Sequence, residues 1–297
     1  MDVTAREQAQ PSLLRDMVML TKPRIISLLL VTTVAPMFVA GNPGWLLVLV
    51  VLIGGYLMAG GANAVNMYLD SDIDTQMART RLRPIPSGRM GPKSVLAFGV
   101  ALATAATFLL ARFTNVLTAL LALGGFYFYV FVYTRWLKRT TPQNIVIGGA
   151  AGAAPPVLGW AAVTNTIDPN ALVLFLIVFT WTPPHFWALA IARRDDYAKV
   201  GIPMLPVTHG IPYTRLQIVL YTILLILTTL LPFLTRMSGL VYLAVAVALN
   251  ARFLYFVMAL NKGIRPELPI RTFRFSITYL MLLFAALIVD HYLYFPA

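Results

Sequence analysis

Residues 45–84 read WLLVLVVLIGGYLMAGGANAVNMYLDSDIDTQMARTRLRP, and this stretch decides the fold. Its first part, 45–68, has no charged side chain and exceeds the roughly 20 helical residues that cross the hydrocarbon core of a bilayer. Its second part carries Asp70, Asp72 and Asp74, followed by Arg79, Arg81 and Arg83. The pattern is typical of a membrane-spanning helix that ends at an aqueous boundary, where charge is tolerated.

The rest of the chain repeats this alternation of apolar runs and short charged connections. Of its 297 residues, 59% are hydrophobic and only 11% are charged, against about 25% in soluble domains. Runs long enough to span a bilayer lie at 25–41, 45–68, 94–111, 115–135, 143–163, 170–192, 214–235, 238–260 and 272–294. The sequence therefore predicts an all-α integral membrane protein with nine transmembrane helices in a single domain over 23–297.

The charge distribution predicts how these helices are oriented. The net charge of +12 comes from basic residues in short connections, which the positive-inside rule explains without a nucleic-acid partner. They concentrate before the first predicted helix and after the second, fourth, sixth and eighth. We therefore expect a cytosolic N-terminal tail over 1–22 and a C-terminus outside. The early acids Asp2, Glu7 and Asp16 are untypical of a secretory signal or a transit peptide, which favours the inner membrane of a prokaryote.

Two proline pairs suggest an internal repeat. Pro23 and Pro36 lie in one predicted helix region, and Pro142 and Pro155 recur 119 residues later in another. A shift by four helices preserves orientation, so the pattern predicts a parallel repeat of helices one to four and five to eight, with the ninth added. The alternative is a chance match of prolines in an apolar chain.

Asn66, Asp70 and Asp74 follow one another at intervals of four residues. In a helix of 3.6 residues per turn, such side chains lie along one stripe. Carboxylates stacked at a membrane boundary repel one another unless a cation neutralises them. Carboxylate and amide oxygens without His or Cys favour a hard ion, and Mg²⁺ typically completes its shell with substrate phosphates. The stripe therefore predicts a catalytic magnesium site.

The arginines that follow the stripe suit an anionic ligand of this metal. Guanidinium groups bind phosphate oxygens in a forked geometry, so Arg79 and Arg83 are candidate diphosphate ligands. The alternative is an ordinary solvated loop that sets topology, which accounts for the arginines but not for the spacing of the acids. Asp72 points away from the stripe, and we expect it to form a salt bridge with a nearby arginine or to act as a charge at the helix end.

A second acidic segment, ARRDDYAKVGIPMLP at 192–206, follows the sixth predicted helix. Asp195 or Asp196 is a candidate ligand of a second metal ion, with Lys199 reaching the diphosphate. Alternatively, Lys199 forms an ordinary surface ion pair with these acids, which precede it by four and three residues. The sequence leaves both interpretations open.

These residues and the strings around them resemble a known family. The pattern of Asn66, Asp70 and Asp74 is similar to the first motif of the UbiA superfamily of intramembrane prenyltransferases. The strings NMYLDSDID, RTRLRP, LKRTTPQNIVIGGAAGAAPP and TWTPPHFWALAIARRDDYAKVGIPMLPV are closely similar to the protohaem IX farnesyltransferases, or haem O synthases, of that superfamily. The similarity runs from about Lys22 to the C-terminus.

The resemblance implies a nine-helix bundle with a cavity open toward the membrane and two acidic motifs that hold Mg²⁺ on the cytosolic side. It also implies farnesyl diphosphate and haem B as substrates, with Arg24, Lys138 and Arg139 as further members of the diphosphate-binding cluster. The second motif of many members is Asp-x-x-x-Asp, whereas here Lys199 stands near the expected second acid and leaves the number of metal ions open. Further implied partners are membrane lipid and a haem A synthase or a terminal oxidase under assembly.

Two polar side chains inside predicted helices are candidate haem contacts. With the 119-residue offset His185 falls at the position of Asn66, so we expect it to face the same cavity, as an axial ligand or a donor to a propionate. A hydrogen-bonded core histidine is the alternative. Arg252 lies deep in the eighth helix, where we expect it to meet a propionate or an acidic side chain, unless it snorkels or that helix is shorter than drawn.

The expected reaction is transfer of the farnesyl group to the 2-vinyl group of haem B, with addition of water, to give haem O and diphosphate. A UbiA-type aromatic prenyltransferase acting on a quinone precursor is the alternative that shares the metal site. A secondary transporter is a third interpretation, based on the nine helices, the repeat and the prolines. Against it, the ionisable groups cluster at the boundary instead of near the middle of the membrane.

Overall fold

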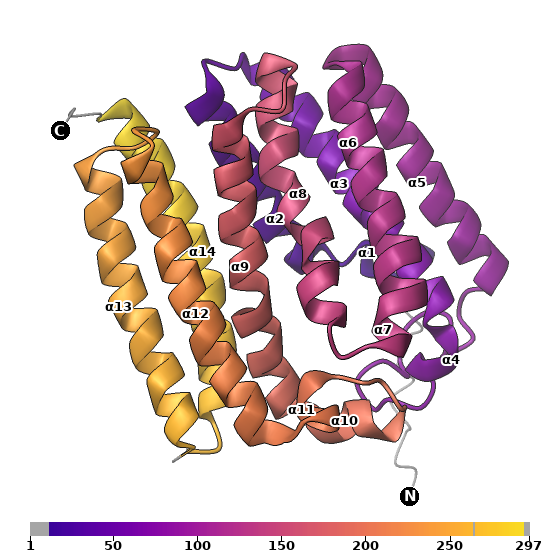
Figure 1. Cartoon of the computed structure of the whole chain (residues 1–297). Coiled ribbons are helices and arrows are strands. Elements are labelled where there is room, and N and C mark those ends of the chain that lie inside the picture. The colour runs from indigo at the N-terminus through magenta and orange to yellow at the C-terminus, as the bar shows by residue number, and fades with distance from the viewer. Residues whose placement is uncertain (1–11, 264, 294–297) are drawn as a thin grey trace, which may run out of the picture.

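The computed structural model describes residues 12–263 and 265–293, and all regular elements in these residues are helices (Figure 1). Nine helical segments of the described chain are long and apolar enough to cross a membrane, which confirms the predicted number. They are α2 (Pro23–Ala40), α3 (Trp45–Leu69), α5 (Pro92–Phe113), α6 (Val116–Tyr127) continued by η1 (Phe128–Leu137) and α7 (Lys138–Thr140), α8 (Asn144–Thr164), α9 (Pro169–Ala192), α12 (Gly210–Leu234), α13 (Leu240–Lys262) and α14 (Leu268–Tyr292).

Most helix boundaries lie within a few residues of the predicted ones. The main differences are extensions of three helices into the charged connections. The helix predicted over 115–135 continues to Thr140, and α12 and α14 begin at Gly210 and Leu268 instead of 214 and 272. Backbone hydrogen bonding continues beyond the apolar run, because charged side chains are tolerated at the boundary. Hydropathy therefore underestimates the length of these helices.

The helices stand side by side, and the short elements α4 (Ser71–Asp74), α10 (Arg194–Lys199) and α11 (Leu205–Thr208) lie together at one end (Figure 1). We call this the charged end. Helix α3 packs against α5, α8 packs against α2 and α9, and α14 contacts both α9 and α2. The arrangement brings the connections after α3, α7 and α9 to the same end of the bundle.

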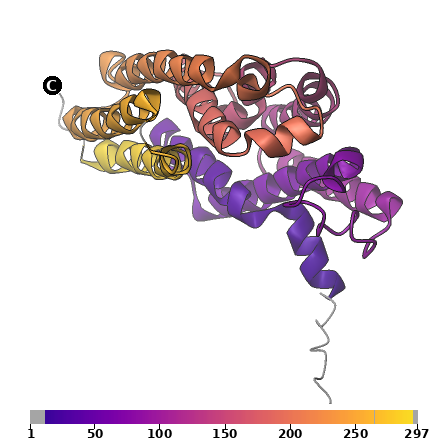
Figure 2. The ribbon, with the colours of Figure 1, turned by 90° about the horizontal axis from the view of Figure 1, so that it is seen from below.

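A short helix, α1 (Leu13–Thr21), lies within the stretch that was expected to be an N-terminal tail. Its buried Asp16 accepts three hydrogen bonds from the guanidinium of Arg89, two of them of 2.9 Å and one of 3.2 Å. Figure 2 shows the bundle from the charged end, with α1 at its edge. This part of the tail is therefore folded onto the connection between α3 and α5.

A close approach between α3 and α5 positions the end of α3. A Cβ atom at Gly61 would lie 2.6 Å from the carbonyl oxygen of Gly99, and one at Gly99 would lie 2.9 Å from that of Gly61. Small residues at such a crossing let membrane helices pack backbone to backbone. The contact holds the segment of α3 that carries Asn66.

Candidate active site

The predicted stripe forms where α3 ends. The helix is interrupted at Asp70, but backbone hydrogen bonds of 2.9 Å from Asp70 to Asn66 and from Asp74 to Asp70 preserve the four-residue register. Asp70 and Asp74 are only 2% and 3% exposed. The amide Nδ2 of Asn66 donates to Asp70 Oδ2 at 2.7 Å. The structure therefore brings the three predicted side chains together.

Each member of the stripe contacts a cationic side chain from another part of the chain. Lys138 Nζ donates to Asp70 Oδ2 at 2.6 Å. Arg83 Nη1 donates to Asp74 Oδ2 at 2.6 Å. Lys22 Nζ donates to Asn66 Oδ1 at 2.9 Å. We call this set the acid–cation cluster: Asn66, Asp70, Asp74, Lys22, Arg83 and Lys138.

One oxygen of the cluster has no hydrogen-bond partner. Asp70 Oδ1 is buried and accepts no hydrogen bond, and Arg139 Nη2 lies 3.8 Å from it. A buried carboxylate oxygen without a hydrogen-bond partner destabilises the folded protein. A hard divalent ion is a suitable partner for such an oxygen. In residues 12–263 and 265–293, no three His, Cys, Asp or Glu side chains lie close enough to hold a metal ion by themselves. The donor set thus fits Mg²⁺ bound through one or two carboxylates and completed by substrate oxygens.

A π-helical segment, η1, supplies a further contact to Asn66. Thr134 Oγ1 donates to the carbonyl of Tyr129, five residues earlier, at 2.9 Å, and accepts from Asn66 Nδ2 at 3.2 Å. The rings of Tyr129 and Tyr133 stack with centroids 5.5 Å apart. Helical turns of this type are rare in proteins, and those that occur often lie at functional sites. The sequence contained no signal for η1, because hydropathy does not distinguish it from an α-helix.

Lys22 is a site residue that the sequence analysis missed. Its backbone has a φ of 56°, which is uncommon for a non-glycine residue and places a bend between α1 and α2. Burial, together with the charges of Arg83 and Lys138, lowers the pKa of Lys22 to about 7. Arg24, which the resemblance implied, is exposed. The only sequence signal was a lysine directly before Pro23, where α2 begins.

Asp72 forms the salt bridge that was predicted for it. Arg139 Nη1 donates to Asp72 Oδ2 at 2.7 Å, and its Nη2 donates to the carbonyl of Leu69 at 2.8 Å. The hydrogen bond from Arg139 lowers the pKa of the Asp72 carboxyl. Arg139 therefore ties α7 to the end of α3, beside the acid–cation cluster.

The second acidic segment does not form the predicted ion pair with Lys199, and its role as a metal ligand stays a prediction. Asp195 has a side chain that is 87% exposed and lies 3.5 Å from Arg194, while Asp196 lies 3.9 Å from Arg193. Lys199 is exposed and forms no ion pair with a residue in the described part of the chain. Arg193 and Arg194 are the partners of these acids instead.

This second segment nevertheless lies near the connection after α3. Burial raises the pKa of Tyr197 in α10, and the nearby charges of Arg79 and Arg193 oppose that rise. Within the described residues neither Asp195 nor Asp196 joins the acid–cation cluster in a group that could hold a metal. The two acidic segments are therefore neighbours at the charged end without forming one shared shell.

His185 packs in the interface between α9 and α14. Its Nδ1 lies 2.6 Å from Ser276 Oγ, and its ring stacks on Trp181 with centroids 4.1 Å apart and faces Phe273 at 4.6 Å. This is the hydrogen-bonded core arrangement that was the alternative to a haem contact. The contacts of the His185 side chain are with α9 itself and with α14, and none of them is with Asn66.

Arg252 is exposed on α13, and its contacts differ from the predicted acidic partner. Its guanidinium carbon lies 5.4 Å from the ring centroid of Tyr255 and 5.0 Å from that of Phe256. Both rings are one turn closer to the charged end, so the side chain runs toward that boundary. With its cation–π contacts and this direction, the Arg252 side chain has the arrangement of a snorkelling arginine, whose charged group extends toward the membrane boundary.

The fold and the cluster at the charged end define an intramembrane prenyltransferase, and the chain belongs to the UbiA prenyltransferase family, which it matches over residues 28–288. It is 53% identical over 281 residues to the protoheme IX farnesyltransferase of Stutzerimonas stutzeri (strain A1501), with 94% of each chain covered. It is also 53% identical over 283 residues to the protoheme IX farnesyltransferase of Alcanivorax borkumensis, covering 94% of this chain and 93% of the relative.

Solved structures of low sequence identity share the fold. A digeranylgeranylglyceryl phosphate synthase superposes with a TM-score of 0.76 at 19% identity, covering 94% of this chain and 98% of the other. A UbiA homologue from Archaeoglobus fulgidus bound to GPP and Mg²⁺ superposes with a TM-score of 0.66 at 14% identity, covering 92% and 99%. The bundle of nine helices is therefore the UbiA fold.

Proposed function

We propose that this chain transfers the farnesyl group of farnesyl diphosphate to the 2-vinyl group of haem B, with addition of water, giving haem O and diphosphate. The observation that carries the proposal is the acid–cation cluster, in which Asp70 keeps a buried carboxylate oxygen without a hydrogen-bond partner. The protoheme IX farnesyltransferases that are 53% identical to this chain support the donor and the acceptor. The homologue bound to GPP and Mg²⁺ supports the metal.

In this proposal the cluster exchanges partners when substrate binds. Asn66, Asp70 and Asp74 would hold Mg²⁺, helped by Asp195 or Asp196 from α10. The cations that now contact the stripe then donate hydrogen bonds to the diphosphate, because charge-assisted bonds to phosphate oxygens are strong. Arg24, Arg79 and Lys199 are exposed and add positive potential at the charged end.

The chemistry needs anion stabilisation more than proton transfer. Bound Mg²⁺ would neutralise the charge that develops on the diphosphate leaving group. Lys138 and Arg83 share that task as the C1–O bond of farnesyl diphosphate breaks. The electrons of the haem vinyl group form the new bond to C1, and water adds to the resulting cation with loss of a proton. An alkene nucleophile requires no strong general base, which agrees with acids already paired with cations.

The charged end is proposed to face the cytosol of a prokaryotic cell, with the protein in the inner membrane, the N-terminus inside and the C-terminus outside. The basic residues of its connections support this orientation. Contacts of His185 and Arg252 with haem stay predictions that are separate from the diphosphate chemistry. The 119-residue repeat likewise stays a prediction.

The decisive experiment is product analysis with the full chain in lipid nanodiscs. Haem B, farnesyl diphosphate and Mg²⁺ are supplied, and pyrophosphate release and the mass of the haem product are measured. We expect both to require haem B and the metal. Prenylation of a quinone-precursor acid instead of haem would establish the aromatic prenyltransferase. If no acceptor yields pyrophosphate but the protein moves a solute across the membrane of proteoliposomes, the transporter interpretation holds.

A further inference from the structure

Thr134 is a buried side chain of η1 that contacts the stripe of acids at the end of α3. It is 0% exposed, and its hydroxyl oxygen lies 2.9 Å from the carbonyl oxygen of Tyr129 and 3.2 Å from Asn66 Nδ2. A carbonyl oxygen only accepts hydrogen bonds, so the single hydroxyl proton of Thr134 is donated to Tyr129. The hydroxyl oxygen is therefore left as an acceptor for Asn66.

The direction of this hydrogen bond fixes the orientation of the Asn66 amide. Because Thr134 offers only an acceptor, the amide presents its NH2 group on that side, and Nδ2 also donates to Asp70 Oδ2 at 2.7 Å. The amide oxygen Oδ1 accepts instead from Lys22 Nζ, at 2.9 Å. Oδ1 is the atom of an asparagine side chain that can bind a hard cation. The contact with Thr134 thus directs this oxygen to a place where it already meets a positive charge.

Thr134 and Asp70 both accept a hydrogen bond from Asn66 Nδ2, but they differ in what else they bind. The same oxygen of Asp70 also accepts from Lys138, and in the proposed function this carboxylate would bind Mg²⁺. The neutral hydroxyl of Thr134 has no cationic partner among the described residues, and its other contact is with the backbone of its own helix. Thr134 is therefore the acceptor that keeps the amide oriented when the partners of Asp70 change.

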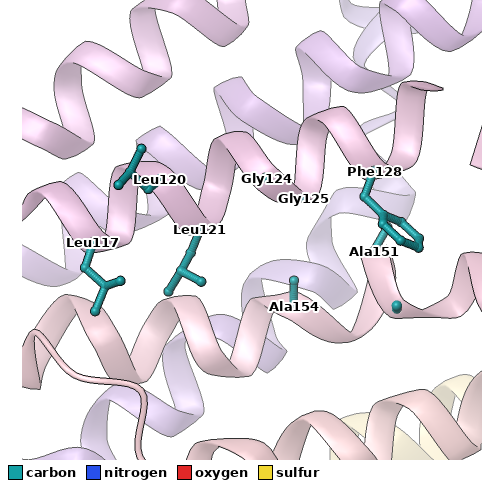
Figure 3. Close-up of a pocket in the computed structure, with 9 residues that line it drawn as sticks. Leu117, Leu120, Leu121, Gly124, Gly125, Phe128, Ala151 and Ala154 are labelled. Carbon is teal, nitrogen blue, oxygen red and sulfur yellow. The ribbon is translucent and has the colours of Figure 1, made fainter. Parts of the chain in front are cut away.

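The segment η1 is held between two helices, which fixes the position of the hydroxyl. It packs against α3 on one side and α8 on the other. Phe128, its first residue, lines an apolar groove together with Ala151 of α8 (Figure 3). The ring of Tyr133 lies so close to α8 that a Cβ atom at Gly148 would overlap with it. The hydroxyl of Thr134 bonds to a carbonyl five residues earlier, which is the hydrogen-bond spacing of a π-helix.

We propose that Thr134 is a positioning residue for the metal site, held by η1 so that the Asn66 amide presents Oδ1 and not Nδ2 to Mg²⁺. The inference rests on the proposed function for the identity of the ion. Lys138 directly follows η1 and contacts Asp70, so the same segment also places a cation of the cluster. Residues that orient a metal ligand in this way change metal affinity about 10- to 100-fold when they are replaced.

Removing the hydroxyl while keeping the shape of the side chain tests this role. Thr134→Val should weaken the binding of Mn²⁺, a paramagnetic substitute for Mg²⁺, about tenfold or more. The measurement is EPR on the full chain in nanodiscs with inorganic pyrophosphate and without haem. Thr134→Ser keeps the hydroxyl and should bind Mn²⁺ within about threefold of the parent protein. Thr134→Ala, which is smaller, repeats the test in case the valine variant does not fold.

Thr222→Val is the matched control. Thr222 is also 0% exposed and its hydroxyl donates to the carbonyl of Ile218 at 2.7 Å, but it lies in α12, outside the acid–cation cluster. This variant should bind Mn²⁺ as the parent does. A second control is the Asn66→Asp background, in which the side chain has no NH2 group to orient. There Thr134→Val should cause no further loss, because the two substitutions act on one interaction.

Kinetics give a readout that a purely structural role would not change in the same way. In Thr134→Val, the Mg²⁺ concentration for half-maximal haem O formation should rise by the same factor as the Mn²⁺ dissociation constant, while kcat at saturating Mg²⁺ stays within about threefold. Unchanged Mn²⁺ binding, an equal loss in Thr222→Val, or a Thr134→Ser variant as weak as the valine would overturn the inference. Mn²⁺ binding that depends on Thr134 in a parent protein that forms no haem O would support the inference and refute the proposed reaction.

Discussion

The two acidic segments at the charged end differ in how their charges are held. In the first, Asp70 and Asp74 are buried and bonded to Lys138 and Arg83, which come from distant positions in the chain or from the next loop. In the second, Asp195 and its neighbour on α10 contact only adjacent arginines, at distances of 3.5 and 3.9 Å. One segment is built by tertiary packing and the other by local pairs.

The difference shows which of the two acidic segments is preformed. Removing one partner of a buried ion pair costs about 3–5 kcal/mol, whereas an exposed pair contributes about 0.2–1 kcal/mol. The first segment therefore keeps its geometry without ligand, while the second can reorient at little cost. We expect substrate to dock on the first segment and to order the second.

The comparison predicts the largest loss of activity for substitutions in the first acidic segment. Asp70→Asn and Asp74→Asn should each lower kcat about 10²- to 10³-fold, because they remove charge from the stripe while keeping its shape. Asp72→Asn is the matched control, since this acid lies between them but is 59% exposed and bonded to Arg139. It should lose less than about threefold. Haem O formation by folded variants in nanodiscs is the measurement, and equal losses at all three positions would refute the stripe.

Within the second segment, the two acids should differ from each other. Asp196→Asn should lower kcat/KM about 10- to 100-fold, because its side chain is only 25% exposed and close to Tyr197. Asp195→Asn, at 87% exposure, should lose less than about threefold. The same kinetic assay, titrated with Mg²⁺, separates metal affinity from chemistry. A larger loss at Asp195 would show that α10 rotates on binding.

A smaller effect is expected at Lys22, whose contact with Asn66 only the tertiary structure shows. Lys22→Met should raise the KM for farnesyl diphosphate about tenfold, since the ammonium group that now donates to Asn66 is proposed to donate to the diphosphate. Arg24→Met changes the same kind of side chain two residues later but on an exposed surface, and should stay within about twofold. If Arg24→Met lowers activity more than Lys22→Met, then Arg24, as the family resemblance implies, is the diphosphate ligand, and Lys22 is not.

The smallest effect on catalysis should come from Asp16 in α1, whose side chain binds Arg89 in the connection between α3 and α5. Asp16→Ala leaves Arg89 without its partner and should lower the free energy of unfolding by about 2 to 3 kcal/mol. The activity of the folded fraction should stay within about threefold. Glu267→Ala, which breaks an exposed pair with Arg271 at 3.9 Å, is the control and should change stability by less than about 0.5 kcal/mol. Thermal unfolding followed by tryptophan fluorescence measures both.

Much of the fold was predictable because a bilayer imposes a simple rule. About 20 apolar residues are needed to cross it, so nine runs of that length predicted nine helices. The register of Asn66, Asp70 and Asp74 was also predictable, because it depends only on helical periodicity. Lys22 and Thr134 were not predictable, since their contacts with Asn66 span 44 and 68 residues of sequence.

The sequence by itself therefore determined the membrane-spanning pattern, the stripe of acids and the family to which the chain belongs. Only the tertiary structure decided which cation meets which acid, that His185 bonds to Ser276 in the α9–α14 interface, and that an apolar groove lies beside α6. The physical reason is that hydropathy and periodicity act along the chain, within one helix. Ion pairing, burial and cavities depend on which helices become neighbours, and close contacts such as that of Gly61 with Gly99 fix those neighbours.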